Sequence, residues 1–167
     1  MVRMTASLRK KLRATTCWIY DFDGVMTDNR VLVLADGGEA VFCHRGDGWA
    51  IKTFRELGHR QFILSTEENP IVMRRAEKLR LPCLHGLADK KAGLLQCAQK
   101  ENIDLRYAAY VGNDENDREA MRMVNLKIAP ADASADIRRL ADLTCRSKGG
   151  YGVLRELLEI YRFANEK

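Results

Sequence analysis

Two aspartates separated by one residue, Asp21 and Asp23, directly follow a short apolar and aromatic segment at residues 17–20. Such a segment predicts a buried parallel strand, and open α/β sheets bind their ligands at the carboxyl ends of the strands. Residues i and i+2 of a strand point to the same side, so the two carboxylates repel each other unless a cation or a shared proton neutralises them. Gly24 permits the sharp turn of a loop over a small ligand. The alternative is an Asp-rich turn without chemistry.

Polar residues also follow the other expected strands, namely Ser65, Lys90 after a short connection, Asn113, Asp114 and Asp117. Parallel strands place their carboxyl ends along one edge of a sheet, so we expect these side chains near the two aspartates. The set suits phosphoryl transfer through an aspartyl phosphate, with one carboxylate attacking phosphorus and a second, protonated one releasing the alcohol. A metal ion, a hydroxyl and an ammonium would hold the phosphoryl oxygens. Each residue alone has a more ordinary interpretation, such as a solvated lysine or an acid in the first turn of a helix.

The elements that must position these residues alternate between strands and helices, which predicts a doubly wound parallel Rossmann-like α/β sheet with helices on both faces. We expect strands near residues 16–22, 61–64, 83–84, 107–111 and 127–128, and helices near 47–57, 70–79, 89–101, 115–124, 133–140 and 152–162. A Gly-rich turn between two apolar segments predicts a β-hairpin at residues 30–43, after the first strand. Residues 4–14 are either a short basic helix or a frayed arm. We therefore divide the chain into a basic N-terminal arm, residues 1–14, and a single domain without a large cap, residues 15–167.

Composition and charge exclude several classes of protein. The net charge of +5 comes largely from basic residues crowded at the N-terminus, whereas the rest of the 167 residues mixes both signs, so we expect no nucleic-acid partner. Five cysteines without C-x-x-C spacing predict reduced thiols rather than disulfides or a zinc site. No apolar segment is long enough to span a membrane, and no hydrophobic signal segment is present. We expect a cytoplasmic protein without a membrane partner.

The order of Asp-x-Asp-Gly, Ser65, Lys90 and a Gly-Asn-Asp segment resembles the four motifs of the haloacid dehalogenase superfamily of phosphatases. The resemblance implies that Asp21 is the nucleophile and a ligand of Mg²⁺. It implies that Asp23 is the general acid/base and gives its main-chain carbonyl to the metal. Ser65 would bind the phosphoryl group, which Lys90 would neutralise, and Gly24 would lie at the substrate.

The last motif departs from the family pattern, which has Asp at the position of Asn113. An Asn carbonyl still ligates a hard cation such as Mg²⁺ but brings no negative charge. We therefore expect either a weaker metal site or a contribution from Asp114. Asp117 is expected to orient metal-bound water.

Longer motifs extend the resemblance over residues 16–162, to phosphatases of eight- and nine-carbon keto-sugar acids and to domains fused behind acylneuraminate cytidylyltransferases. These motifs are residues 24–28, the hairpin, residues 45–51 and residues 148–156. The resemblance implies a homotetramer in which the hairpins join centrally and each subunit caps its neighbour. It also implies that Arg45 and Asp47 help to bind the sugar, although Asp47 is alternatively the N-cap of its helix.

Within that group, Thr66, Glu67 and Lys78 favour the branch that acts on 2-keto-3-deoxynononate 9-phosphate or a related nonulosonate phosphate. The branch specific for 3-deoxy-manno-octulosonate 8-phosphate typically has Gly-Arg at positions 66–67, and its substrate is the alternative. Lys78 would meet the substrate carboxylate and Glu67 an amino or hydroxyl group. The alternative for Lys78 is that, with Glu77, it only forms the solvated face of a highly charged helix. Two other classes are a weakly active tetramerisation module and a receiver-type signalling domain. Asp-x-Asp-Gly within one strand end argues against the receiver.

Overall fold

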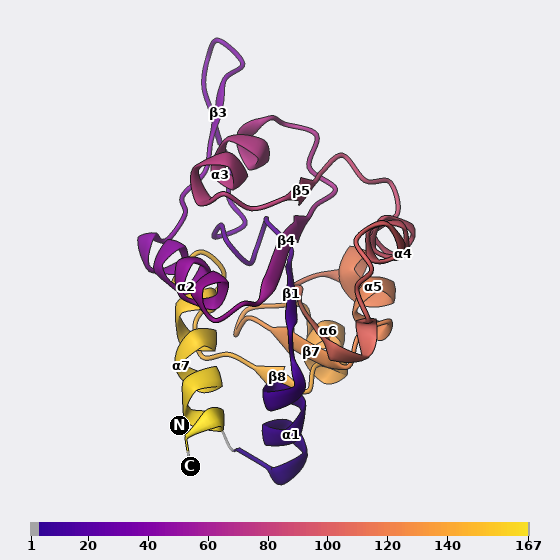
Figure 1. The fold of residues 1–167 in the computed structure, drawn as a ribbon. Coiled ribbons are helices and arrows are strands. Elements are labelled where there is room, and N and C mark those ends of the chain that lie inside the picture. Colours follow the sequence, from indigo (N-terminus) through magenta and orange to yellow (C-terminus); the bar gives the residue numbers. More distant parts are fainter. Residues whose placement is uncertain (1–3, 167) are drawn as a thin grey trace.

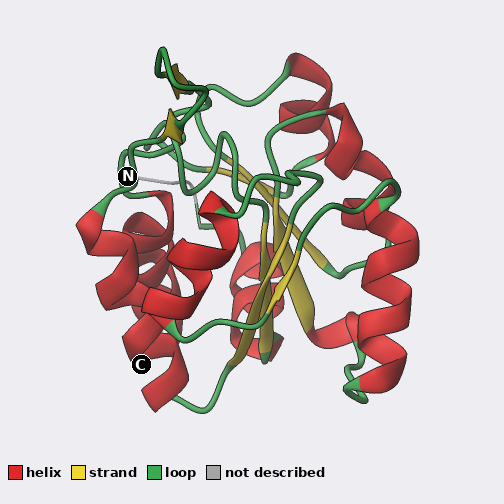
Figure 2. Ribbon diagram, turned by 90° about the horizontal axis from the view of Figure 1, so that it is seen from above, coloured by secondary structure: helices red, strands yellow, loops and turns green. Residues whose placement is uncertain are grey.

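A six-stranded parallel sheet forms the centre of the computed structural model, which describes residues 4–166 (Figure 1). The strands are β1 (Cys17–Tyr20), β4 (Arg60–Leu64), β5 (Cys83–Leu84), β6 (Ala108–Val111), β7 (Leu126–Ala129) and β8 (Leu143–Thr144). Their order is β5-β4-β1-β6-β7-β8, so the chain starts in the middle, winds to one edge and then to the other. Helices cover both faces (Figure 2). This topology confirms the predicted doubly wound Rossmann-like sheet.

The central strand β1 is buried at all four positions because it has a strand on each side and helices on both faces. Its alternate residues enter two separate apolar clusters: Trp18 and Tyr20 belong to one, and Cys17 and Ile19 to the other. This is the period of two that a strand imposes on its side chains. The strand therefore delivers the residues that follow it to a fixed position at the carboxyl edge.

The helices lie close to where the periodicity predicts them. They are α1 (Ala6–Ala14), α2 (Arg45–Glu56), α3 (Ile71–Leu79), α4 (Lys90–Lys100), α5 (Arg118–Arg122), α6 (Ala135–Leu140) and α7 (Val153–Asn165). The expected helix at residues 115–124 is split into a 3-10 turn, Glu115–Asp117, and the short α5, and a second 3-10 turn spans Leu105–Tyr107. Strand β8 was not predicted. Between residues 4 and 166, no helix combines the length and apolarity needed to cross a membrane.

At the N-terminus the structure shows the helical alternative. Leu8 and Leu12 of α1 are buried in the core. Arg13 Nε donates to the main-chain oxygen of Ala164 at 2.6 Å, and Arg9 Nη1 donates to the same oxygen at 3.1 Å, so the basic residues cap the end of α7. Ala6–Ala14 is therefore not a frayed arm, and residues 1–3 lie outside the described part.

The predicted hairpin is present and projects away from the sheet (Figure 1). Its strands, β2 (Leu32–Val33) and β3 (Glu39–Ala40), are shorter than expected. Five large apolar side chains around it are exposed, from 46% for Leu34 to 72% for Phe42; the others are Val31, Leu32 and Val33. Apart from this hairpin, the described chain contains no cap over the carboxyl edge of the sheet.

Candidate active site

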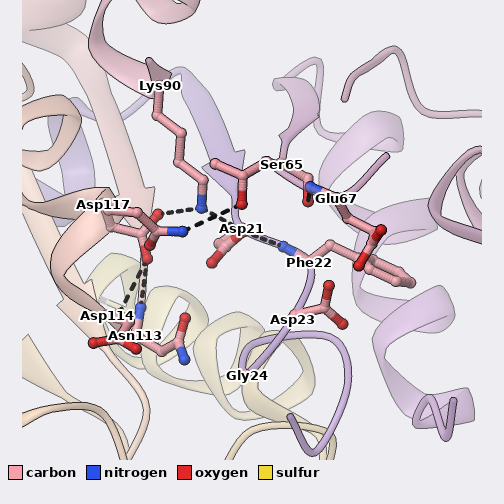
Figure 3. A network of polar contacts seen from close by, with 12 residues as sticks. Asp21, Phe22, Asp23, Gly24, Ser65, Glu67, Lys90, Asn113, Asp114 and Asp117 are labelled. Carbon is pink, nitrogen blue, oxygen red and sulfur yellow. Dashed lines mark hydrogen bonds and ion pairs between the residues drawn. The ribbon is translucent and has the colours of Figure 1, made fainter. Parts of the chain in front are cut away.

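The carboxyl edge of the sheet gathers the polar residues that the motifs predicted (Figure 3). Asp21 and Asp23 follow β1, Ser65 follows β4, Lys90 opens α4, and Asn113 and Asp117 follow β6. The chain reverses its winding direction between β1 and β6, and open α/β sheets bind their ligands outside the strand ends at such a switch point. The topology thus brings residues more than 90 positions apart in the sequence to one site.

Lys90 lies between two carboxylates. Its Nζ is 2.7 Å from Asp21 Oδ1 and 2.7 Å from Asp117 Oδ1, and all three side chains are almost completely buried. Burial lowers the pKa of Lys90, but the two carboxylates outweigh it and raise that pKa. Burial and the charge of Asp117 likewise raise the pKa of Asp21 well above its ordinary value, although Lys90 opposes them. The trio of Asp21, Lys90 and Asp117 has one positive charge for two negative ones, so it needs a further cation or a proton.

Asp117 uses its oxygens entirely within the protein. Oδ1 accepts from Lys90 Nζ and, at 2.8 Å, from the hydroxyl of Tyr110, while Oδ2 accepts from the main-chain nitrogens of Asn113 at 2.8 Å and Asp114 at 3.3 Å. The Asp114 carboxylate is exposed and accepts from the nitrogen of Glu115, which starts the 3-10 turn. Asp117 therefore holds both Lys90 and the loop that carries Asn113.

The Asn113 amide completes an oxygen-lined cradle beside Asp21. Its site-facing end lies 2.9 Å from the main-chain oxygen of Asp23 and 3.0 Å from Asp21 Oδ2. If the amide nitrogen occupies this end, it donates a hydrogen bond to both oxygens. If the amide oxygen occupies it, three oxygens face one another, an arrangement that a bound hard cation stabilises. Gly24 allows the approach, because a Cβ there would collide with the Asn113 amide. Within the described residues, no group of three His, Cys, Asp or Glu side chains is placed to hold a metal. The carboxylate, carbonyl and amide oxygens of the cradle are ligands of the kind that Mg²⁺ prefers.

Asp23 lies in a setting that favours its protonated form. Burial raises its pKa; a hydrogen bond donated by Thr27 Oγ1 at 3.0 Å opposes this, and the nearby charge of Glu67 adds to it. A carboxyl that keeps its proton suits a general acid. The pKa of Asp21 is raised as well, so burial alone does not separate the roles of the two carboxyls.

The residues after β4 lie at the same carboxyl edge of the sheet. The buried Ser65 Oγ accepts from the main-chain nitrogen of Glu67 at 3.1 Å, which leaves its own proton for a phosphoryl oxygen. Glu67 is half-buried, and its Oε1 accepts from the nitrogen of Asn69 at 2.7 Å. Thr66 is exposed, and its hydroxyl accepts from Asn116 at 3.3 Å.

Three predicted substrate-binding residues lie outside this network. Lys78 on α3 and Arg45 on α2 are exposed, and within the described residues neither makes a hydrogen bond or ion pair with the trio. Asp47 is not the N-cap of α2, a position that His44 occupies. Instead the buried Asp47 Oδ1 accepts from the nitrogen of Arg155 at 3.0 Å and so caps the first turn of α7. The sequence could not show this because the two segments are 108 residues apart.

Asp47→Asn is expected to stabilise the fold at neutral pH. Burial raises the pKa of Asp47 from 3.8 to about 6, although the Arg155 nitrogen opposes it. The pKa of Asp47 is higher in the folded than in the unfolded state, so its contribution to the free energy of unfolding is fully present below the unfolded pKa. The protein loses this contribution, up to about 3 kcal/mol, as pH rises through about 6. Asn keeps the acceptor without the charge. Urea unfolding of both proteins between about pH 4.5 and pH 7.5 should give a difference that grows with pH; a constant difference would contradict the expectation.

Two members of the site were not predicted: Thr27, which contacts Asp23, and Tyr110, which contacts Asp117. The four-residue spacing of Asp23 and Thr27 was a usable signal, since a tight turn brings such residues together. The Gly149–Gly150 segment packs on this chain's own residues 24–28.

Residues 61–157, more than half of the chain, match the model of the haloacid dehalogenase-like hydrolases. The chain is 27% identical to 3-deoxy-D-manno-octulosonate 8-phosphate phosphatase KdsC of Haemophilus influenzae, over 96% of this chain and 89% of that protein. It is 28% identical to N-acylneuraminate cytidylyltransferase A of Danio rerio over 81% of this chain, but spans only 32% of that relative.

The fold is shared with a solved relative. A 3-deoxy-D-manno-octulosonate 8-phosphate phosphatase of Moraxella catarrhalis, solved with a magnesium ion, a phosphate ion and a KDO molecule, superposes with a TM-score of 0.91. The identity is 25%, and the match covers 96% of this chain and 93% of that one. The similarity therefore extends over nearly the whole chain.

Proposed function

The chain belongs to the haloacid dehalogenase-like hydrolases and is a phosphatase related to KdsC, and from that premise we propose that it hydrolyses the phosphomonoester of a keto-deoxy sugar acid with Mg²⁺ as cofactor. The observation that carries the proposal is the buried trio at the carboxyl edge, whose excess negative charge faces the oxygen cradle of Asn113. Asp21, the Asp23 carbonyl and the Asn113 amide would hold Mg²⁺. The bound ion would screen the negative charges of nucleophile and substrate.

The residues divide the reaction into two transfers. The Asp21 carboxylate attacks phosphorus, and the bond from phosphorus to the sugar oxygen breaks as Asp23 gives that oxygen its proton. Ser65 and Lys90 bind the phosphoryl oxygens during this transfer. Asp23, now ionised, then takes a proton from water, whose oxygen attacks phosphorus and releases phosphate from Asp21.

Within this substrate class we propose a preference for a nine-carbon acid, 2-keto-3-deoxynononate 9-phosphate or a related nonulosonate phosphate. The support is Glu67, which is half-buried next to Ser65 and close enough to Asp23 to affect its pKa, so it borders the space where the substrate must lie. The second candidate is 3-deoxy-manno-octulosonate 8-phosphate, which the names of the KdsC relatives favour.

A phosphate-release assay with Mg²⁺ tests both the proposed phosphatase activity and the proposed substrate preference. We expect both keto-deoxy acid phosphates to be hydrolysed with a higher kcat/KM than a neutral sugar phosphate such as glucose 6-phosphate, and chelation of the metal to stop turnover. A double variant, Thr66→Gly with Glu67→Arg, should shift the preference toward the eight-carbon acid. Turnover of no ester in the panel would overturn the enzymatic function, and a wild-type preference for the eight-carbon acid would select the second candidate.

We also propose that the exposed hairpin joins four copies of the chain. Its five exposed apolar side chains form the kind of patch that monomeric proteins avoid, and a neighbouring subunit would bury them over the otherwise uncapped site. If the protein forms a tetramer but hydrolyses no ester, its role is instead that of a tetramerisation module.

Val33→Asp is expected to break this assembly, because it places a charge in the proposed interface. Light scattering coupled to gel filtration should give four times the chain mass of 19.0 kDa for the wild type and a smaller multiple for the variant. Lys52→Asp, on an exposed position of α2, is the matched control and should keep the wild-type mass. A monomeric wild type would contradict the proposal.

A further inference from the structure

The chain returns from near its C-terminus to touch the loop that carries Asp23. We name residues 148–152 the glycine turn and residues 23–28 the acid loop. A Cβ on Gly149 would collide with the main-chain oxygen of Gly24 and lie 2.9 Å from that of Thr27, and a Cβ on Gly150 would lie 2.5 Å from the nitrogen of Asp28. The two backbones are therefore in direct contact, which only glycine allows.

The contact includes a hydrogen bond and a backbone conformation that suits glycine. The nitrogen of Gly150 donates to the main-chain oxygen of Val25 at 3.0 Å, and Gly150 has a φ of +73°. Gly149 is buried beneath the acid loop. The glycine turn thus supports the acid loop along several consecutive residues.

On its other side the glycine turn is anchored to the body of the domain. The nitrogen of Gly149 donates to Asp132 Oδ1 at 2.9 Å, in the loop after β7. Glu156 of α7 accepts from the nitrogens of Arg146 and Ser147 at 2.9 and 2.7 Å, just before the turn. The turn is therefore held between β7 and α7 and does not depend on the acid loop for its own position.

The acid loop connects the glycine turn to the carboxyl of Asp23. Thr27 is fully buried, and its Oγ1 donates to Asp23 Oδ1 at 3.0 Å while accepting from the nitrogen of Gly24 at 3.3 Å. Since the Thr27 carbonyl lies against Gly149, the glycine turn and the Asp23 carboxyl are linked through a single buried residue.

We infer that the glycine turn is a clamp that positions Asp23 as the general acid, with Thr27 as the positioning residue between them. This inference rests on the proposed function. The turn fixes the main chain of the acid loop, and the Thr27 hydroxyl then fixes the Asp23 carboxyl, so that its proton points toward the leaving oxygen. Thr27 and the glycines act on the reaction only through Asp23.

Changing the leaving group of the substrate tests this role. An alcohol must take a proton from Asp23 as its bond to phosphorus breaks, whereas an acidic phenol leaves without one. The measurement is kcat/KM over a series of phosphate monoesters from alcohols to phenols, since kcat/KM reports the step that forms the aspartyl phosphate. For Gly149→Ala and Gly150→Ala we expect about 10²-fold greater loss on alkyl than on aryl esters, the lower range for general acid catalysis.

Matched variants separate positioning from folding. Gly58 has a φ of +82° with open space around it, so Gly58→Ala introduces the backbone strain of Gly150→Ala without the contact, and should leave the dependence on the leaving group unchanged. Thr27→Ser keeps the hydroxyl and should resemble the wild type, whereas Thr27→Val should reproduce the selective loss on alkyl esters. If the glycine variants do not fold, the two Thr27 variants decide.

Two results would overturn the clamp. One is an equal loss on alkyl and aryl esters in the glycine variants, which indicates a structural role only. The other is an unchanged leaving-group dependence in Thr27→Val. A wild type that hydrolyses no ester of the series would instead overturn the proposed function, so the two failures are distinguishable.

Discussion

Asp21→Asn is expected to abolish phosphate release while making the protein more stable in the absence of magnesium. An amide does not attack phosphorus, so we expect kcat to fall by about 10⁴-fold or more. The gain in stability follows from the buried trio, because removing one of its two negative charges leaves Lys90 paired with Asp117 alone. Burial raises the pKa of Asp21, so its ionised form costs free energy in the folded state. Phosphate release and thermal unfolding, each with and without Mg²⁺, measure the two effects.

The same variant should lose most of the stabilisation that Mg²⁺ confers on the wild type, because a ligand stabilises only the state that binds it. Asp136→Asn, which changes an exposed carboxylate on α6, is the matched control and should keep both the activity and the response to Mg²⁺. Wild-type turnover by Asp21→Asn would contradict its role as nucleophile. An unchanged response to Mg²⁺ would remove Asp21 from the metal site.

Lys90→Met is expected to abolish activity and also to destabilise the protein, in contrast to Asp21→Asn. The variant leaves the Asp21 and Asp117 carboxylates buried together without a cation, which should lower the free energy of unfolding by about 3–5 kcal/mol near neutral pH. The loss should shrink toward about pH 5, because the pKa of Asp21 rises further without Lys90 and a protonated carboxyl relieves the repulsion. Urea unfolding of variant and wild type at both pH values measures it.

The adjacent residue supplies the control. Lys91 is half-buried on the same helix, and no ion pair of its side chain occurs among the described residues, so Lys91→Met should change stability by no more than about 0.5 kcal/mol. A destabilisation of Lys90→Met that does not vary with pH would contradict the charge argument and indicate lost packing alone. Opposite signs for the stability of Asp21→Asn and Lys90→Met, with activity lost in both, would show that the trio carries excess negative charge.

The buried charges of this site lower the stability of the fold but favour its chemistry. A buried carboxylate with an insufficient counter-charge destabilises the fold on its own but is ready to bind a cation and an electrophile. Burial raises the pKa of Asp23 as well, and the nearby charge of Glu67 adds to the rise. In the proposed mechanism these two residues of one motif act as nucleophile and general acid.

The sequence by itself determined the parallel sheet, its order of strands and helices, and the set of residues at its carboxyl edge. Strand and helix periods are local patterns. Because Asp21 and Asp23 directly follow a strand, their side chains must lie at its carboxyl end. The same local patterns did not predict β8, and they overestimated the strands of the hairpin.

Only the tertiary structure decided how the charges of the site are shared. That Asp117 holds Lys90, that Asp47 caps α7 and that Gly149 lies beneath the acid loop each depend on residues 27 to more than 100 positions apart. Hydrogen bonds and burial act through space, so their partners and the pKa shifts they cause appear only when the sheet has brought distant segments together. Sequence spacing thus identified which groups could react, and packing decided how deeply each of them is buried and which partners it contacts.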